Sequence, residues 1–230
     1  MTTRTLAGVL LVVAPIWFNI WFAVLARRFD YPDILRKPIE EILSRFRAGG
    51  SGLILIWWAF AASGGLFVAA AVLLSIVLFP QAKTASVVAL VVGVLAGLVQ
   101  VLGLLRWVYL VPSLARAYGD AEASEATQSA VEVTFRAFHH YLGVGVGEHL
   151  GYLLTGAWTG FVGFAILTGD ALAPWLGWVA LPLAVGLVAA SVEFLGPNEE
   201  RGWALAGKAV PLLYIAWSLW LLAVGLSLII

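Results

Sequence analysis

The chain of 230 residues contains no cysteine, only three histidines, and few charged side chains, which make up 11% of its residues. The absence of cysteine excludes disulfides, iron–sulfur ligation and thiol catalysis. The histidines (His139, His140 and His149) all belong to one segment, which limits metal and haem chemistry. The 13 basic residues balance the 13 acidic ones, so net charge gives no indication of nucleic-acid binding. We therefore expect no cofactor and no nucleic-acid partner.

Apolar residues dominate what remains, at 62% of the chain, whereas soluble domains are about 45–50% apolar and about 25% charged. A transmembrane helix needs roughly 20 mostly apolar residues. Six stretches meet this requirement: residues 5–26, 53–79, 87–110, 142–167, 175–194 and 210–230. The sequence thus predicts an all-α, polytopic transmembrane bundle that forms a single domain over residues 1–230.

The positions of lysine and arginine predict the orientation of the bundle. Eleven of them fall in the loops after the first, third and fifth spans or at the edges of those loops, and only Arg4 and Lys83 fall on the other side. Because cytoplasmic loops are enriched in basic residues, we expect a bacterial cytoplasmic-membrane protein with both termini outside. Trp57 and Trp107 then flank the cytoplasmic face, where we expect them to anchor spans at the interface.

The two long cytoplasmic loops carry amphipathic patterns. In the first, Ile39, Ile42, Leu43 and Phe46 follow Pro38 at helical spacing, and Gly49-Gly50 ends the pattern. This pattern predicts a short helix in the headgroup region, which is either an ordinary amphipathic connector or a specific lipid sensor. In the second, a helix that starts near Ala121, capped by Asp120, is expected to lead into the fourth span.

Ionisable side chains inside a membrane are costly and mark candidate sites. Here they gather in the cytoplasmic leaflet, and the outer leaflet is nearly free of charge. The candidate ligand-binding residues are Glu148, His149, Arg106, Tyr152, Glu193 and Asn19.

The fourth span has two distinct faces on an α-helical wheel. Tyr141, Glu148, Tyr152 and Thr155 form a polar stripe, and the ladder Gly143, Gly147 and Gly151 permits close helix packing. Two interpretations stay open: a ligand pocket lined by Glu148, His149, Tyr152 and Arg106, or a buried Glu148–Arg106 ion pair that fixes helix register.

Metal binding and catalysis have weaker support. On an α-helical wheel His140 and His149 lie 180° apart, so they are not expected to bind one ion together. A metal site would need His149 with Glu148 and Glu193. No nucleophile and base stand together in the sequence.

Two stretches carry a family resemblance. They are Leu105-Arg106-Trp107 with residues 111–118 (VPSLARAY), and residues 140–155 (HYLGVGVGEHLGYLLT). Together they resemble a bacterial family of small polytopic membrane proteins known as domain of unknown function 4386. The resemblance runs from about the third span onward, and residues 27–36 are less typical of the family. It implies a membrane location and a multi-span architecture, and it implies no activity.

Three classes of function remain open. The first is a non-enzymatic protein that binds a lipid, a small ligand or a partner protein, including a second copy of this chain, through the polar cluster. The second is a proton-coupled or small-molecule transporter, which would favour inverted repeats and midplane polar groups. The third is a membrane-embedded enzyme that acts on a lipid or quinone. We favour the first, because the polar groups lie off the midplane and no catalytic set converges.

Overall fold

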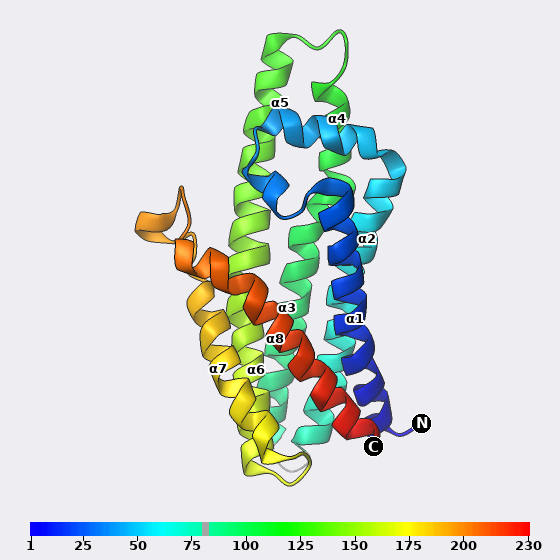
Figure 1. The fold of residues 1–230 in the computed structure, drawn as a ribbon, viewed down its shortest axis with the longest axis vertical. Helices are drawn as coiled ribbons and strands as arrows, with labels where there is room; N and C mark the ends of the chain where they lie inside the picture. Colours follow the sequence, from blue (N-terminus) through cyan, green and yellow to red (C-terminus); the bar gives the residue numbers. More distant parts are fainter. Residues whose placement is uncertain (80–82) are drawn as a thin grey trace.

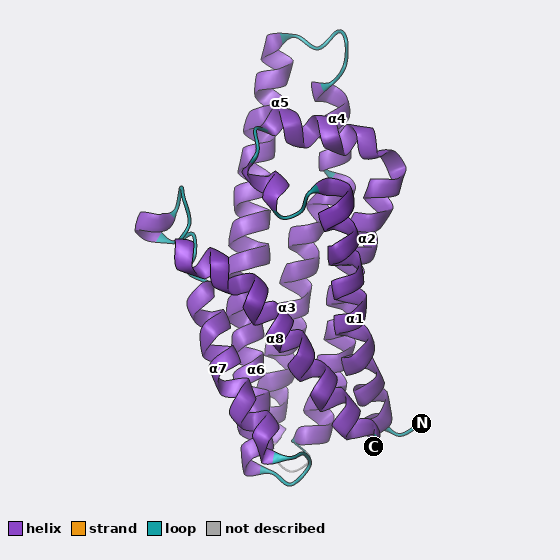
Figure 2. Ribbon diagram, in the orientation of Figure 1, coloured by secondary structure: helices purple, strands orange, loops and turns teal. Residues whose placement is uncertain are grey.

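The computed structural model describes residues 1–79 and 83–230, and it is built from helices and their connections (Figure 2). Helices make up 86% of the residues that the structure describes, which confirms the all-α prediction. In chain order they are α1 (Thr3–Phe29), η1 (Asp33–Arg36), α2 (Ile39–Leu78), α3 (Lys83–Tyr109), α4 (Val111–Tyr118), α5 (Glu125–Phe138), η2 (His139–Leu150), α6 (Gly151–Thr168), α7 (Pro174–Ala190), η3 (Gly196–Asn198) and α8 (Ala204–Ile229).

Five helical stretches of the described residues are long and apolar enough to cross a membrane: Thr3–Phe29, Ile39–Leu78, Thr84–Tyr118, Glu125–Thr168 and Ala204–Ile229. The sixth apolar helix, α7, has only 17 residues. At 1.5 Å per residue α7 is roughly 25 Å long, less than the ~30 Å hydrocarbon core of a bilayer. The chain is therefore a multi-pass membrane protein. The predicted fifth span was too long at its end, because the helix stops at Ala190 and not at Phe194.

The six apolar helices α1, α2, α3, α6, α7 and α8 pack side by side in a closed ring. Helix α2 packs between α1 and α3, α1 also packs on α8, α8 on α7, α7 on α6, and α6 on α3. Figure 1 shows both termini at one end of this bundle, opposite the end that carries α4 and α5. We call these the terminal end and the α4–α5 end.

Two hydrophobic cores fill the ring. The core nearer the terminal end includes Trp158, Trp217 and Trp220. The core nearer the α4–α5 end is built around Trp57 and Trp107, whose stacked rings lie 4.6 Å apart at 7°. Both of these tryptophans are fully buried, so the prediction that they anchor spans at the membrane interface was wrong. Their rings instead meet Phe29 edge-on inside the second core.

The amphipathic segment of the first long loop forms the start of α2. Gly50, at φ 56° and ψ −153°, interrupts the helix just after it, as the glycine pair predicted. Ile42, Leu43 and Phe46 are buried in the second core with Phe135 of α5. The prediction of a helix lying among lipid headgroups was therefore wrong, since its apolar stripe packs on protein.

The second long loop also forms helices, and α5 continues through η2 into α6 as expected. The start of α5 was placed too early, however. Ser124, and not Asp120, caps the helix: its side chain accepts a hydrogen bond from the backbone N–H of Thr127.

Candidate functional site

Residues His139–Leu150, which include the start of the predicted fourth span, form a π-helix between α5 and α6. A π-helix closes i→i+5 hydrogen bonds, so each turn holds more residues than the 3.6 of an α-helix, and such segments occur frequently at functional sites. Side chains four residues apart therefore lie in rows along the surface of this helix.

One such row is the glycine ladder, and it faces α3. A Cβ added at Gly147 would lie 3.3 Å from the Cα of Gly103, and one at Gly151 would lie 3.1 Å from Cγ of Gln100. A Cβ at Gly143 would lie 2.6 Å from Nη2 of Arg106. The ladder thus lets η2 and α3 approach closely, as the sequence indicated.

Two further rows face a cavity on another side of η2. One row is His140, Val144, Glu148 and Tyr152, and the other is Ala137, Tyr141, Gly145 and His149. The prediction that His140 and His149 point in opposite directions was therefore wrong. It assumed α-helical winding, whereas the wider π winding brings both residues to the same cavity.

The opposite wall is the chain that follows α7. Because α7 ends at Ala190 while η2 and α5 continue past it (Figure 1), the helix leaves part of η2 uncovered. Nδ1 of His149 lies 2.8 Å from the carbonyl oxygen of Ser191 and joins the two walls. The cavity between them has a volume of about 310 Å³. Besides the two rows on η2 and its flanks, its lining residues are Ala190, Ser191, Glu193, Phe194 and Leu195.

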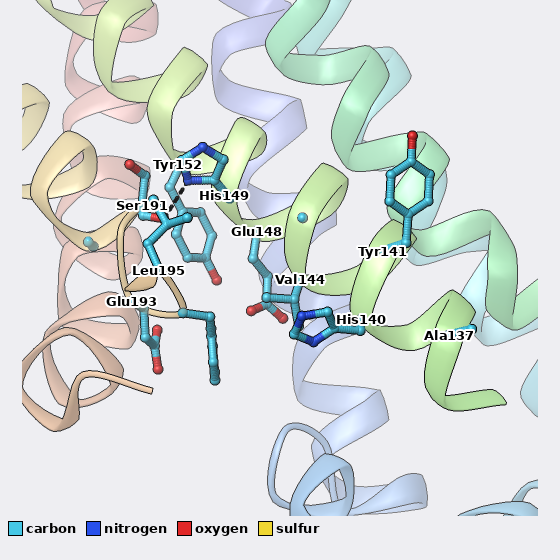
Figure 3. A pocket seen from close by; sticks show the side chains of 13 residues that line it. Ala137, His140, Tyr141, Val144, Glu148, His149, Tyr152, Ser191, Glu193 and Leu195 are labelled. Carbon is cyan, nitrogen blue, oxygen red and sulfur yellow. Dashed lines mark hydrogen bonds between the residues drawn. The ribbon is translucent and has the colours of Figure 1, made fainter. Parts of the chain in front are cut away.

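Figure 3 shows how the polar side chains lie in the cavity. The carboxylate of Glu148, the hydroxyl of Tyr152 and the ring of His140 point toward one another, whereas Tyr141 points away from them. No ion pair within residues 1–79 and 83–230 includes Glu148. Its carboxylate faces the cavity without a cationic partner from the described part of the chain.

Arg106 lies on the α3 side of η2, outside the cavity lining. Only 8% of its surface is exposed. Its guanidinium donates to the carbonyl of Gly103, and Nη2 lies 3.4 Å from Nδ1 of His139. Its Nε has no hydrogen-bond partner among the described residues. The direct Glu148–Arg106 ion pair that one interpretation required is therefore not formed in the described structure.

The sequence model of one family matches residues 6–225 of the chain, and that family is described as domain of unknown function 4386. The chain belongs to the DUF4386 family. The match includes at least part of each of the six apolar helices and all of residues 27–36, so restricting the resemblance to the later spans was too narrow. No curated protein and no solved structure matches the chain.

Other polar candidates have structural partners in this DUF4386 fold. Nδ2 of Asn19 donates to the carbonyl of Pro15 and to Oγ of Ser218, at 2.7 and 3.0 Å. Asn19 thus ties α1 to α8 and does not line the cavity. Thr155 accepts a hydrogen bond from Gln100 of α3 and is fully buried, so it leaves the polar stripe that the α-helical wheel predicted.

Burial also raises the pKa of two titratable groups outside the spanning helices, Glu193 and Tyr31. Partial burial raises the pKa of the Glu193 carboxyl, and the Arg36 guanidinium opposes this rise. Burial raises the pKa of Tyr31 to about 12; the Glu148 carboxylate adds to the rise, and Arg106 opposes it. Tyr31 therefore keeps its proton at neutral pH and can act as a hydrogen-bond donor.

The structure brings together Glu148, His149, Tyr152 and Glu193 of the DUF4386 chain, and it leaves Arg106 and Asn19 outside the cavity. Within the described residues, no three side chains of histidine, aspartate or glutamate gather closely enough to hold a metal ion. The cavity residues that were not predicted include His140, Val144 and, after α7, Ser191, Phe194 and Leu195. The spacing of four from His140 to Tyr152 was the available signal for the first two. The arrangement provides a mostly apolar cleft with a carboxylate, a phenol and an imidazole at its inner end.

Proposed function

We propose that this membrane protein binds an amphiphilic ligand, a lipid or a lipid-like small molecule, in the cavity between η2 and the chain after α7. The observation that carries the proposal is the early end of α7. It opens a cavity of about 310 Å³ between η2 and the chain after α7, with polar side chains directed inward. Cavities of about 300–1,000 Å³ with apolar walls and a few oriented polar groups are typical of small-molecule sites.

The membrane setting favours an amphiphile over a fully polar molecule. Val144, Phe194 and Leu195 supply apolar walls, and Leu195 is 48% exposed. A ligand with a polar headgroup and an apolar chain satisfies both parts of such a site. By the distribution of lysine and arginine the α4–α5 end faces the cytoplasm, and the cavity then lies near the cytoplasmic headgroups of a bacterial inner membrane.

The test is native mass spectrometry of the purified protein with and without added bacterial lipid extract. Val144→Trp places a large ring in the cavity, and Val133→Trp is the matched control on an exposed part of α5. We expect the wild type and Val133→Trp to retain a bound amphiphile and Val144→Trp to lose it. Retention by Val144→Trp, or a wild type that stays empty with lipid extract, would overturn the proposal. If the wild type carries a solute across liposome membranes and Val144→Trp abolishes that flux, the cavity serves transport and not binding alone.

A further inference from the structure

The charge of the cavity wall indicates the chemical class of the ligand. The lining includes two carboxylates, Glu148 and Glu193, two histidines, and no lysine or arginine. An anionic headgroup would place its charge beside these carboxylates without a permanent cation to balance it. Charge complementarity at a binding surface favours the opposite sign and rejects like charges.

The basic side chains nearest in the fold have contacts other than Glu148. Arg106 bonds Gly103 and His139 on the other side of η2. Arg36, whose charge influences both Glu148 and Glu193, forms its ion pair with Asp33 at 3.4 Å. His140 lies 3.5 Å from the carboxylate of Glu199. The Glu148 carboxylate is thus left to a group from outside the described chain, and an unpaired carboxylate in a membrane leaflet is costly.

Aromatic rings supply a second, independent feature for recognising a cation. Tyr152, Phe194 and His140 contribute rings to the lining. The ring of Tyr152 is held against Tyr214 of α8, with ring centroids 5.5 Å apart. Aromatic faces attract ammonium groups, including quaternary ones, through their electron-rich faces.

We infer that the ligand carries an ammonium group, which binds against the carboxylate of Glu148 and beside the ring of Tyr152. Glu193 adds a second carboxyl group on the opposite wall. The inference rests on the proposed binding function and specifies its ligand class. An ammonium group can belong to a lipid headgroup, as in phosphatidylethanolamine or phosphatidylcholine, or to a free amphiphilic amine, and the binding chemistry is shared.

The test measures binding of three short-chain lipids to the detergent-purified protein by isothermal titration calorimetry. The probes are phosphatidylethanolamine, phosphatidylcholine and anionic phosphatidylglycerol of equal chain length, with dodecyltrimethylammonium as an amine that lacks phosphate. We expect an ammonium probe to bind about tenfold or more tightly than phosphatidylglycerol, because the Glu148 carboxylate and the Tyr152 ring attract a cation and not an anion. A response to dodecyltrimethylammonium alone would assign the site to free amines, and a response to the zwitterionic lipids would assign it to headgroups.

Glu148→Gln removes the charge at nearly constant shape, and Glu122→Gln is the matched control at an exposed position outside the cavity. We expect Glu148→Gln to erase the preference for ammonium probes and Glu122→Gln to keep it. If Glu148→Gln does not fold, Glu148→Asp retains the carboxylate and is expected to retain the preference. Equal binding of phosphatidylglycerol to the wild type, or an unchanged preference in Glu148→Gln, would overturn the inference. If Val144→Trp still abolishes binding in that case, the proposed function stands and only the ligand class fails.

Discussion

Nδ1 of His149 lies 2.8 Å from the carbonyl oxygen of Ser191. A carbonyl oxygen can only accept, so His149 carries a proton on Nδ1 and donates it. This hydrogen bond connects the π-helix η2 to the first residue after α7. It is a polar contact that joins the two walls of the cavity.

We expect His149→Ala to lower the free energy of unfolding by about 1–3 kcal/mol, because the Ser191 carbonyl loses its donor in a partly buried site. His149→Asn carries an amide donor at a similar distance from the backbone and should recover part of the loss. Thermal unfolding in detergent measures both variants. Equal melting temperatures for His149→Ala and the wild type would show that this hydrogen bond does not hold the walls together.

Close packing of η2 on α3 gives a second prediction. A Cβ at Gly103 would lie 2.7 Å from the Cα of Gly147, whereas a Cβ at Gly145 would have the carbonyl oxygen of His140 as its nearest neighbour, at 3.7 Å. We expect Gly103→Ala to destabilise the protein by about 1–3 kcal/mol, since backbone must shift to admit the methyl group. Gly145→Ala, made at a glycine of the same helix pair, should be close to neutral. Similar melting temperatures for the two variants would contradict the close approach of η2 and α3.

The separation of Glu148 from Arg106 predicts weak coupling between them. Removing one partner of a direct buried ion pair typically costs about 3–5 kcal/mol. We expect the effects of Glu148→Gln and Arg106→Gln on unfolding to add to within about 1 kcal/mol in the double variant. Denaturant titration of the four proteins completes this cycle, and a coupling of several kcal/mol would restore the ion-pair interpretation.

The raised pKa of Glu193 predicts a pH dependence of stability. Burial favours the protonated carboxyl in the folded state, so the folded protein binds this proton more tightly than the unfolded chain does. The resulting stabilisation is complete below the ordinary pKa of glutamate and is lost as pH rises through the folded-state pKa. We therefore expect the melting temperature of the wild type to fall relative to that of Glu193→Gln as pH is raised from 4 to 8. A constant difference over this interval would contradict the assignment.

Hydropathy alone predicted the helical bundle well, because a bilayer requires long apolar stretches whose backbone bonds are satisfied internally. Hydropathy did not predict which of those stretches pack against one another. Ile42 and Phe46 formed a plain amphipathic pattern, and only the fold shows that Phe46 packs on Trp107, which lies about sixty residues further along the chain. A stripe of this kind looks the same in sequence whether lipid or protein covers it.

The candidate site was predicted in part. Glu148, His149, Tyr152 and Glu193 were identified as ionisable or polar groups in apolar surroundings, and the cavity gathers all four. The role of His140 was missed because an α-helical wheel places it opposite His149, and the π winding of His139–Leu150 changes that geometry. Periodicity arguments assume a helix type, so they fail where the helix type itself changes.

Photocrosslinking with a phospholipid that carries a diazirine in its acyl chain tests the central claim most directly, because it reports where an amphiphile sits. The protein is irradiated in nanodiscs, digested and mapped by mass spectrometry, with Val144→Trp as the comparison. Binding in the cavity predicts crosslinks concentrated on His139–Leu150 and on residues 191–195 that disappear in Val144→Trp. Crosslinks spread evenly over the lipid-facing helices, and unchanged in the variant, would contradict the account.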